Sequence, residues 1–176
     1  MKKFIITAAI ILASNTFFAQ SLFDKFDGQD NVTSIIVNNK MFDLMSKIKM
    51  EGSDKETQQY INLLKKLDNL KVFMTNSTKV AADMKISADS FLKTSKLEEL
   101  MRVNDNGRNV KIFVKSGASD SQIKELFMFI EGSGKNNQSV IMSLTGDFDL
   151  NELSSLTNKM HLPGGDELKK ASNSKK

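Results

Sequence analysis

The chain has 176 residues, no cysteine, and 25 basic against 21 acidic residues, which gives a formal net charge of +4 at pH 7. The absence of cysteine excludes a disulfide framework, a thiolate metal site, a thiol nucleophile and lipid attachment through a lipobox cysteine. Two lysines lie near the N-terminus, and four lysines and two acids follow Pro163; removing them from 25 and 21 leaves 19 basic and 19 acidic residues. A neutral body argues against nucleic acid as a partner.

The N-terminus has the composition of a secretory signal peptide. Lys2 and Lys3 precede an apolar run that extends from Phe4 to about Ala13. This run is shorter than the roughly 20 residues of a membrane-spanning helix, so cleavage is favoured over anchoring. We predict a signal peptide over residues 1–19, no transmembrane anchor after cleavage, and export to the periplasm or the extracellular space.

A polar leader is expected to follow over residues 20–31, with apolar side chains at Leu22, Phe23 and Phe26. This leader is either flexible or a strap that lays those side chains on the body. The β-branched run 32–37 predicts the first strand.

Helical spacing replaces the strand pattern after residue 38. Apolar side chains between Met41 and Ile48 predict one short helix. Ser53 is a candidate N-cap for the next helix, and Glu56 three residues later completes a capping-box pattern.

The segment 70–75 alternates between apolar and other side chains and predicts the second strand. Residues 77–103 are then expected to be helical in two pieces. The second piece is marked by the spacing of Leu97, Leu100 and Met101.

Three short runs with period-two alternation lie between residues 109 and 146, separated by glycine, serine and asparagine. One face of the predicted strands is aliphatic and carries Val110, Ile112, Val114, Leu126, Met128, Ile130, Val140, Met142 and Leu144. The opposite face, with the second strand, carries Phe73, Phe113, Phe127, Phe129 and Ile141 among Lys111 and Lys115.

The last helix is expected from Asp149 to Met160. Asp149 can cap its first turn, and Glu152 occupies the third position of a capping box. The tail 163–176 is basic and has little to bury, which predicts disorder.

The order of elements predicts a single α+β domain over residues 32–162. We expect two layers, with a sheet of about five strands, mixed or antiparallel, and helices packed mainly on one face.

Four stretches carry a resemblance to a known family: VTSIIVNNKMFDLM, KLEELMRVNDNGRNVKIFVK, IKELFMFIEG and SVIMSLTGDFDLNELSSL. Together they cover about Val32 to Leu156, and Glu98 to Val103 is the most specific part. The chain resembles uncharacterised exported proteins of Bacteroidota that form domain-of-unknown-function family 4252.

The resemblance implies an envelope protein of unassigned function with no agreed catalytic residues. Many members carry a lipobox cysteine, and this chain departs from that pattern. Members are often encoded near extracytoplasmic-function sigma factors, which implies a link to envelope-stress regulation.

Candidate chemistry in the body is sparse. His161 is the only histidine and lies at the end of the last predicted helix, so no histidine-based triad is expected. Asp147 and Asp149 have the spacing of a turn and a cap rather than of an acid/base dyad. A calcium loop starting at Asp147 would need glycine where Glu152 stands. We predict no catalytic, cofactor or metal site.

The aromatic face is the one surface that the sequence singles out. Its members are Phe73, Phe113, Phe127, Phe129 and Ile141, with Lys111 and Lys115 beside them. Either a helix or the leader covers these side chains as a second small core, or they form a surface for a partner or for self-association.

These observations favour a non-catalytic binding or accessory module of the envelope that contacts another envelope protein or a second copy of itself. The alternative is a small-ligand carrier or hydrolase with a pocket between the sheet and the helices.

Overall fold

The computed structural model describes residues 22–47, 55–105, 107–119, 121–132 and 138–173. The expected signal peptide and the expected N-cap Ser53 lie outside these ranges. Within the described part of the chain, no helix combines the length and apolar character needed to cross a bilayer.

The elements follow one another along the chain, and the sheet strands account for most of the described residues between 67 and 149. In order they are β1 (Val32–Asn38), α3 (Asn39–Lys47), α4 (Lys55–Leu64), β2 (Leu67–Thr75), α5 (Thr78–Thr94), β3 (Glu98–Asp105), β4 (Arg108–Ser116), β5 (Gln122–Glu131), β6 (Ser139–Asp149), the 3₁₀ turn η2 (Leu150–Glu152), α6 (Leu153–Met160) and α7 (Gly165–Asn173).

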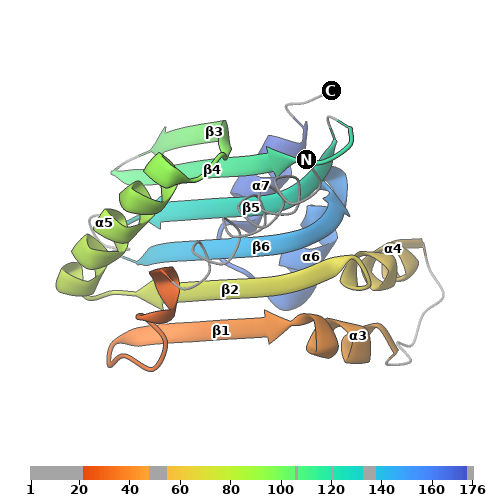
Figure 1. Ribbon diagram of the computed structural model, residues 1–176, viewed down its shortest axis with the longest axis horizontal. Helices are drawn as coiled ribbons and strands as arrows, with labels where there is room; N and C mark the ends of the chain where they lie inside the picture. The colour runs from red at the N-terminus through yellow and green to blue at the C-terminus, as the bar shows by residue number, and fades with distance from the viewer. Residues whose placement is uncertain (1–21, 48–54, 106, 120, 133–137, 174–176) are drawn as a thin grey trace, which may run out of the picture.

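The described strands form one antiparallel sheet of six, in the order β1-β2-β6-β5-β4-β3 (Figure 1). The α+β class is therefore confirmed, and the predicted meander of three strands is β4, β5 and β6. The expected number of about five strands is one too low, because β3 was assigned to a helix.

The segment Glu98–Asp105 is a strand although its apolar residues have helical spacing. Its pairing with β4 shifts register between Glu99 and Met101, so Leu100 stands outside the regular alternation. At a β-bulge, two neighbouring residues of one strand stand opposite a single residue of its partner, which interrupts the period-two alternation. Leu97, Leu100 and Met101 consequently mimic a helical stripe.

One face of the sheet is aliphatic and packs against α4, α6 and α7. The nine residues predicted for this face are all buried in one core cluster, together with leucines of the three helices. Cross-strand pairs such as Ile112 with Met128 and Met128 with Met142 show that the alternation was assigned to the correct register.

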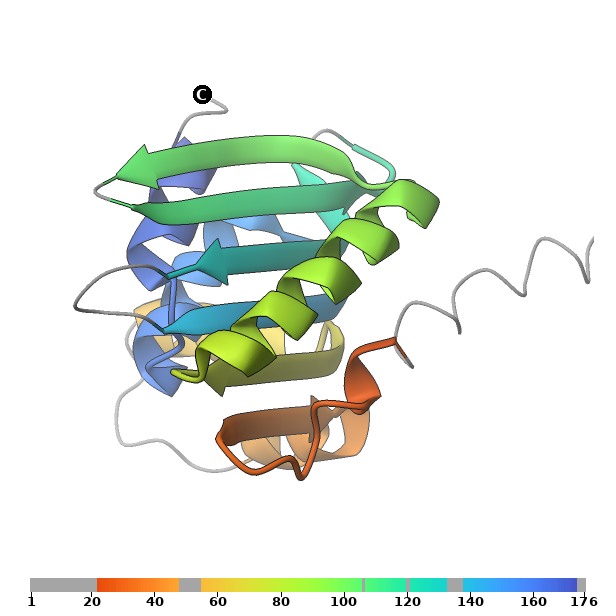
Figure 2. The same cartoon turned by 90° about the vertical axis from the view of Figure 1, so that its left-hand side faces the viewer.

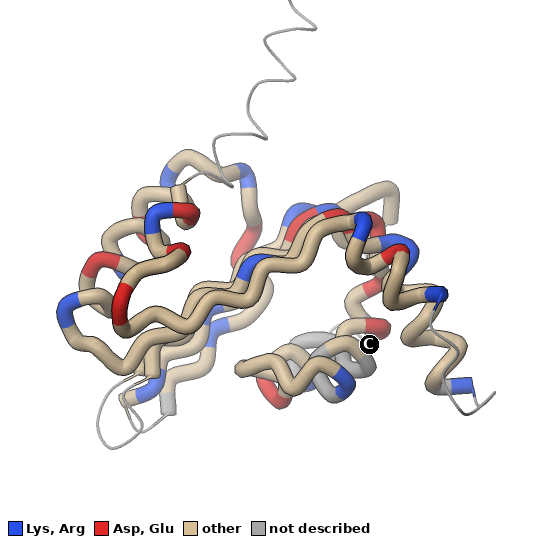
Figure 3. Tube along the Cα trace, turned by 90° about the horizontal axis from the view of Figure 1, so that it is seen from below, with Lys and Arg blue, Asp and Glu red and all other residues tan. Residues whose placement is uncertain are grey.

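The opposite face packs against α5 and the leader. Met84, Ala88 and Phe91 of α5 join Phe23 and Phe26 of the leader in a second core cluster. In Figures 2 and 3, α5 and the leader lie on one side of the sheet and the C-terminal helices on the other. Helices thus occupy both faces, and the sheet is the middle of three layers instead of one of the expected two.

The tail after Pro163 is partly helical, which corrects the expected disorder. Helix α7 begins after Gly164, whose positive φ of 80° suits glycine. Leu168 is only 1% exposed and packs into the aliphatic core cluster. One buried leucine on a polar segment is enough to dock this short helix, although composition alone does not reveal it.

Candidate functional site

The aromatic face is a core and not a surface. Phe73, Phe127 and Ile141 are fully buried and Phe129 is 2% exposed, while Phe113 is partly buried at the margin of the same cluster. The hypothesis of an exposed aromatic interaction surface is therefore wrong for the four buried residues. The physical reason is that α5 and the leader remove this face from water.

The leader covers the aromatic face through ring contacts. Phe23 stacks on Phe127 with ring centroids 5.4 Å apart and meets Phe91 edge-on at 5.3 Å. Phe26 lies 6.2 Å from Phe73, and Asp24 forms an ion pair with Lys71 of β2. Of the two alternatives for the leader, its described part is a strap laid on the body.

The two predicted lysines precede and follow Phe113 on β4, with side chains on the same face of the sheet. Lys111 is half-buried opposite Phe129, and Lys115 is exposed opposite Glu125. Burial raises the pKa of the Glu125 carboxyl, and the charge of Lys115 offsets part of that rise. The structure does not unite the seven predicted residues into one open site.

A polar groove of about 680 Å³ opens at one end of the sheet, where the α4–β2 turn, the start of β5 and the end of β6 meet. It is lined by Lys65, Lys66, Asp68, Ser119, Ser121, Gln122, Asp147, Phe148 and Asp149. The backbone approaches closely here, since a Cβ on Gly146 would lie 2.4 Å from the Lys66 carbonyl oxygen. The groove is thus built around a close crossing of two chain segments.

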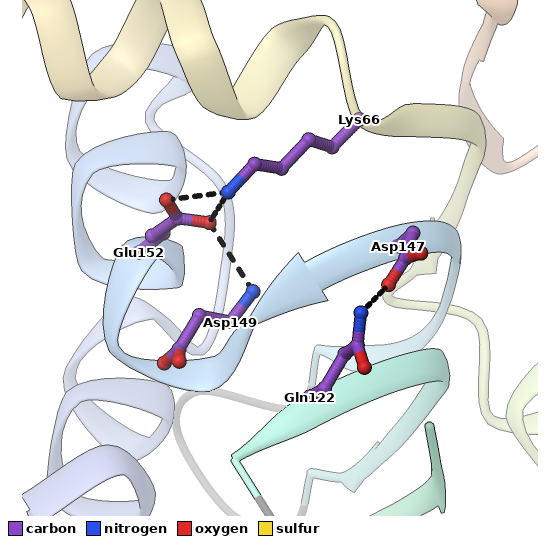
Figure 4. A network of polar contacts seen from close by, with 5 residues as sticks. All are labelled: Lys66, Gln122, Asp147, Asp149 and Glu152. Atoms are coloured by element: carbon purple, nitrogen blue, oxygen red, sulfur yellow. Dashed lines mark hydrogen bonds and ion pairs between the residues drawn. The ribbon is translucent and has the colours of Figure 1, made fainter. Parts of the chain in front are cut away.

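Beside this groove, Asp149 and Glu152 make one of the two hydrogen bonds of the predicted capping box. Asp149 is nevertheless the last residue of β6, and the 3₁₀ turn η2 separates it from α6, so the helix begins at Leu153 and not at the predicted Asp149. Glu152 accepts a hydrogen bond from the backbone N–H of Asp149 at 3.2 Å (Figure 4). The two oxygens of the same carboxylate accept hydrogen bonds from Lys66 Nζ, Oε1 at 2.8 Å and Oε2 at 2.9 Å. Lys66 therefore ties the α4–β2 turn to the start of α6, which is a structural role.

Asp147, which lines the groove, is held in its ionised form by its neighbours. Its carboxylate accepts hydrogen bonds from Lys124 Nζ at 2.7 Å and from the Gln122 side-chain amide. The hydrogen bond from Lys124 is the main cause that lowers the pKa of Asp147. Figure 4 places Asp147 beside Gln122 and Asp149 beside Glu152, so the two carboxyls do not share a proton. A carboxyl with a lowered pKa is poorly suited to act as a general acid.

A second groove, of about 390 Å³, lies between β4 and the last helices. Arg108 Nη1 and Glu167 Oε1 form an ion pair of 2.8 Å in it, and His161 lines it at the end of α6. This groove was missed because α7 was not expected. Among the described residues, no three histidine or acidic side chains come together as metal ligands.

The remaining candidate is the free edge of β1. Among the described residues β1 pairs only with β2, through seven consecutive residues with no break in register. Its sequence VTSIIVN contains no charge and no proline. An edge strand of this kind offers unpaired backbone N–H and C=O groups to another strand.

Apolar side chains flank this edge. Ile36 is 46% exposed on β1, and Met41 and Leu44 are 50% and 51% exposed on α3, which follows β1 directly. We call the outer edge of β1 together with Ile36, Met41 and Leu44 the β1 edge patch. The uncharged run VTSIIVN is visible in the sequence, but only the strand order shows that β1 lies at an edge of the sheet.

The other edge of the sheet is protected. Strand β3 carries Glu98, Glu99 and Arg102, and its pairing with β4 is interrupted by a bulge. Charges and bulges are the devices by which natural sheets discourage pairing at an edge. The contrast within one sheet singles out β1.

The fold and these surfaces define a class: an α+β domain whose six-stranded antiparallel sheet is covered on both faces and has one unprotected edge. The family model for "Domain of unknown function (DUF4252)" matches residues 26–156, so the chain belongs to this family. Neither the curated proteins nor the solved structures that were compared contain a significant match.

Proposed function

We propose that this protein is exported to the cell envelope and acts there as a non-catalytic binding module. The observation that carries the proposal is the β1 edge patch, which combines an open uncharged strand with three exposed apolar side chains. Its partner would be a polypeptide that adds an extended strand to β1, since backbone hydrogen bonds give such binding its affinity and alternate side chains its specificity.

The polar contacts in and beside the groove support binding over catalysis. Asp147 in the groove and Glu152 beside it are each engaged by a lysine and by a further hydrogen-bond donor. The spaces between sheet and helices are filled by the two core clusters. An accessory role in envelope-stress regulation is part of this proposal, and it rests on the family's implied genomic setting.

The test is mild crosslinking of the protein in the envelope of its own host, followed by identification of what is attached. We expect a reproducible partner with the native chain, and its loss with Ile36→Lys, which puts a charge on the β1 edge. Ile86→Lys is the matched control, because Ile86 is 67% exposed on α5. A partner that is retained equally by both variants would contradict binding at β1.

A further inference from the structure

We infer that the β1 edge patch pairs two copies of this chain, strand against strand, around a two-fold axis perpendicular to the sheet. The inference deepens the proposed function, on which it rests, by naming a second copy as the occupant of the edge. It would join the two six-stranded sheets into one continuous antiparallel sheet.

The length of β1 selects one register. Pairing centred on Ile35 sets Val32 opposite Asn38, Thr33 opposite Val37 and Ser34 opposite Ile36 of the second copy, so all seven residues take part. Any other centre leaves residues of the strand unpaired. The run is uncharged throughout, so no like charges oppose each other when the strand meets itself.

Charges just beyond the strand complement each other in this register. Asp30 precedes β1 and Lys40 follows it, at equal distances from Ile35 along the chain. Both are exposed, and no ion pair among the described residues involves either. A two-fold axis at Ile35 brings Asp30 of each copy to the end where Lys40 of the other lies, so the attraction occurs twice.

The apolar part of the patch lies where the second copy would reach. Helix α3 starts at Asn39, where Asn38 Oδ1 accepts a hydrogen bond from the Met41 N–H at 3.0 Å. This cap fixes the helix against the end of β1, so the exposed Met41 and Leu44 move with the strand. In the paired arrangement α3 of one copy lies beside the leader of the other, and these side chains lose contact with water.

The experiment is sedimentation velocity over a range of concentrations, on the chain from Gln20 onward. We expect a monomer–dimer equilibrium. Ile36→Lys should raise the dissociation constant about tenfold or more, because a lysine then lies on each paired strand. Ile86→Lys, on the exposed side of α5, should leave the constant unchanged.

Charge reversal tests the register. Asp30→Lys and Lys40→Asp should each weaken the dimer about threefold to tenfold at low ionic strength, and less at high salt. The double variant should restore the native constant, because the two charges then attract again with reversed sign. Circular dichroism should show all variants folded, since both residues are exposed.

Three results would overturn the inference: a monomer at every concentration, a dimer that Ile36→Lys leaves intact, or single charge reversals whose effects the double variant does not cancel. A monomer that still loses its crosslinked partner through Ile36→Lys would refute the second copy as occupant and leave the proposed function standing. A β1-dependent dimer without any other partner would confirm the inference and show that the polypeptide that adds its strand to β1 is a second copy.

Discussion

The Glu125 carboxyl lies on the aromatic face of the sheet, two residues before Phe127 on β5 and opposite Lys115 of β4. Burial is the main cause of its raised pKa, so between the ordinary value of 4.5 and the raised value the folded chain binds more protons than the unfolded chain. Stability then falls as pH rises through this window. We expect the free energy of unfolding in urea to vary less with pH in this window for Glu125→Gln than for the native protein. Above the window, Glu125→Gln should be more stable than the native protein.

Asp147 is a control for this prediction, because its pKa is shifted in the opposite direction from that of Glu125. Its pKa is lowered from 3.8 chiefly by the hydrogen bond to Lys124, so its contribution is present above the ordinary value and lost as pH falls. Asp147→Asn should therefore reduce stability at neutral pH and converge with the native protein in acid. If Glu125→Gln behaved in the same direction as Asp147→Asn, burial would not govern Glu125.

Phe129 tests whether the aromatic face is core. It is 2% exposed within the second cluster, so Phe129→Glu would place a carboxylate among buried apolar side chains, and pairing with the half-buried Lys111 opposite it would still cost the desolvation of both charges. We expect this variant to be unfolded at neutral pH by far- and near-ultraviolet circular dichroism. Ile86→Glu, at an exposed position of α5, should change the free energy of unfolding by no more than about 0.5 kcal/mol. A folded Phe129→Glu protein would mean that the face opens.

At the scale of elements, the alternation of the central strands was enough to predict β4, β5, β6 and both of their faces. Two elements could not be predicted this way. The bulge in β3 set Leu100 and Met101 side by side and produced a helical spacing in a strand. Helix α7 is polar apart from Leu168, and it is ordered by a contact that exists only once β4, β5 and α6 have assembled.

Helix α7 is therefore expected to depend on burial more than on its ion pair. Leu168→Ala should cost about 2–5 kcal/mol in urea unfolding, because it leaves a cavity in the aliphatic cluster. Arg108→Gln removes the 2.8 Å ion pair with Glu167. Because the Arg108 side chain is 46% exposed, this change should lower the free energy of unfolding by at most about 1 kcal/mol. Equal losses, or a larger loss for Arg108→Gln, would show that the ion pair docks the helix.

At the scale of the whole molecule, the sheet is covered on both faces, so of the two alternatives that the sequence left open for the aromatic face, the covered second core is the correct one. Phenylalanines between lysines on a strand have the pattern of an open, half-polar face. The side chains that close it come from residues 22–26 and from α5, which are distant from β4 and β5 in the chain. The unprotected edge became recognisable only when the strand order showed that β1 is terminal.

The strand order also predicts a gradient of amide hydrogen exchange. Strand β6 lies between β2 and β5, so its amides should exchange slowest, through global unfolding. In dilute solution the outward amides of β1 and β3 should exchange fast, because both strands lie at the edges of the sheet. Raising the protein concentration should slow amide exchange in β1 but not in β3, since the charges and the bulge of β3 discourage pairing with another strand.

The Ile36→Lys variant completes this measurement. Its β1 amides should stay fast at every concentration, while β6 keeps its protection because β2 separates Ile36 from β6. Slow exchange of β1 in the most dilute native sample, unchanged in the variant, would mean that another part of the same chain covers the edge. In that case neither a second copy nor an added strand could occupy it.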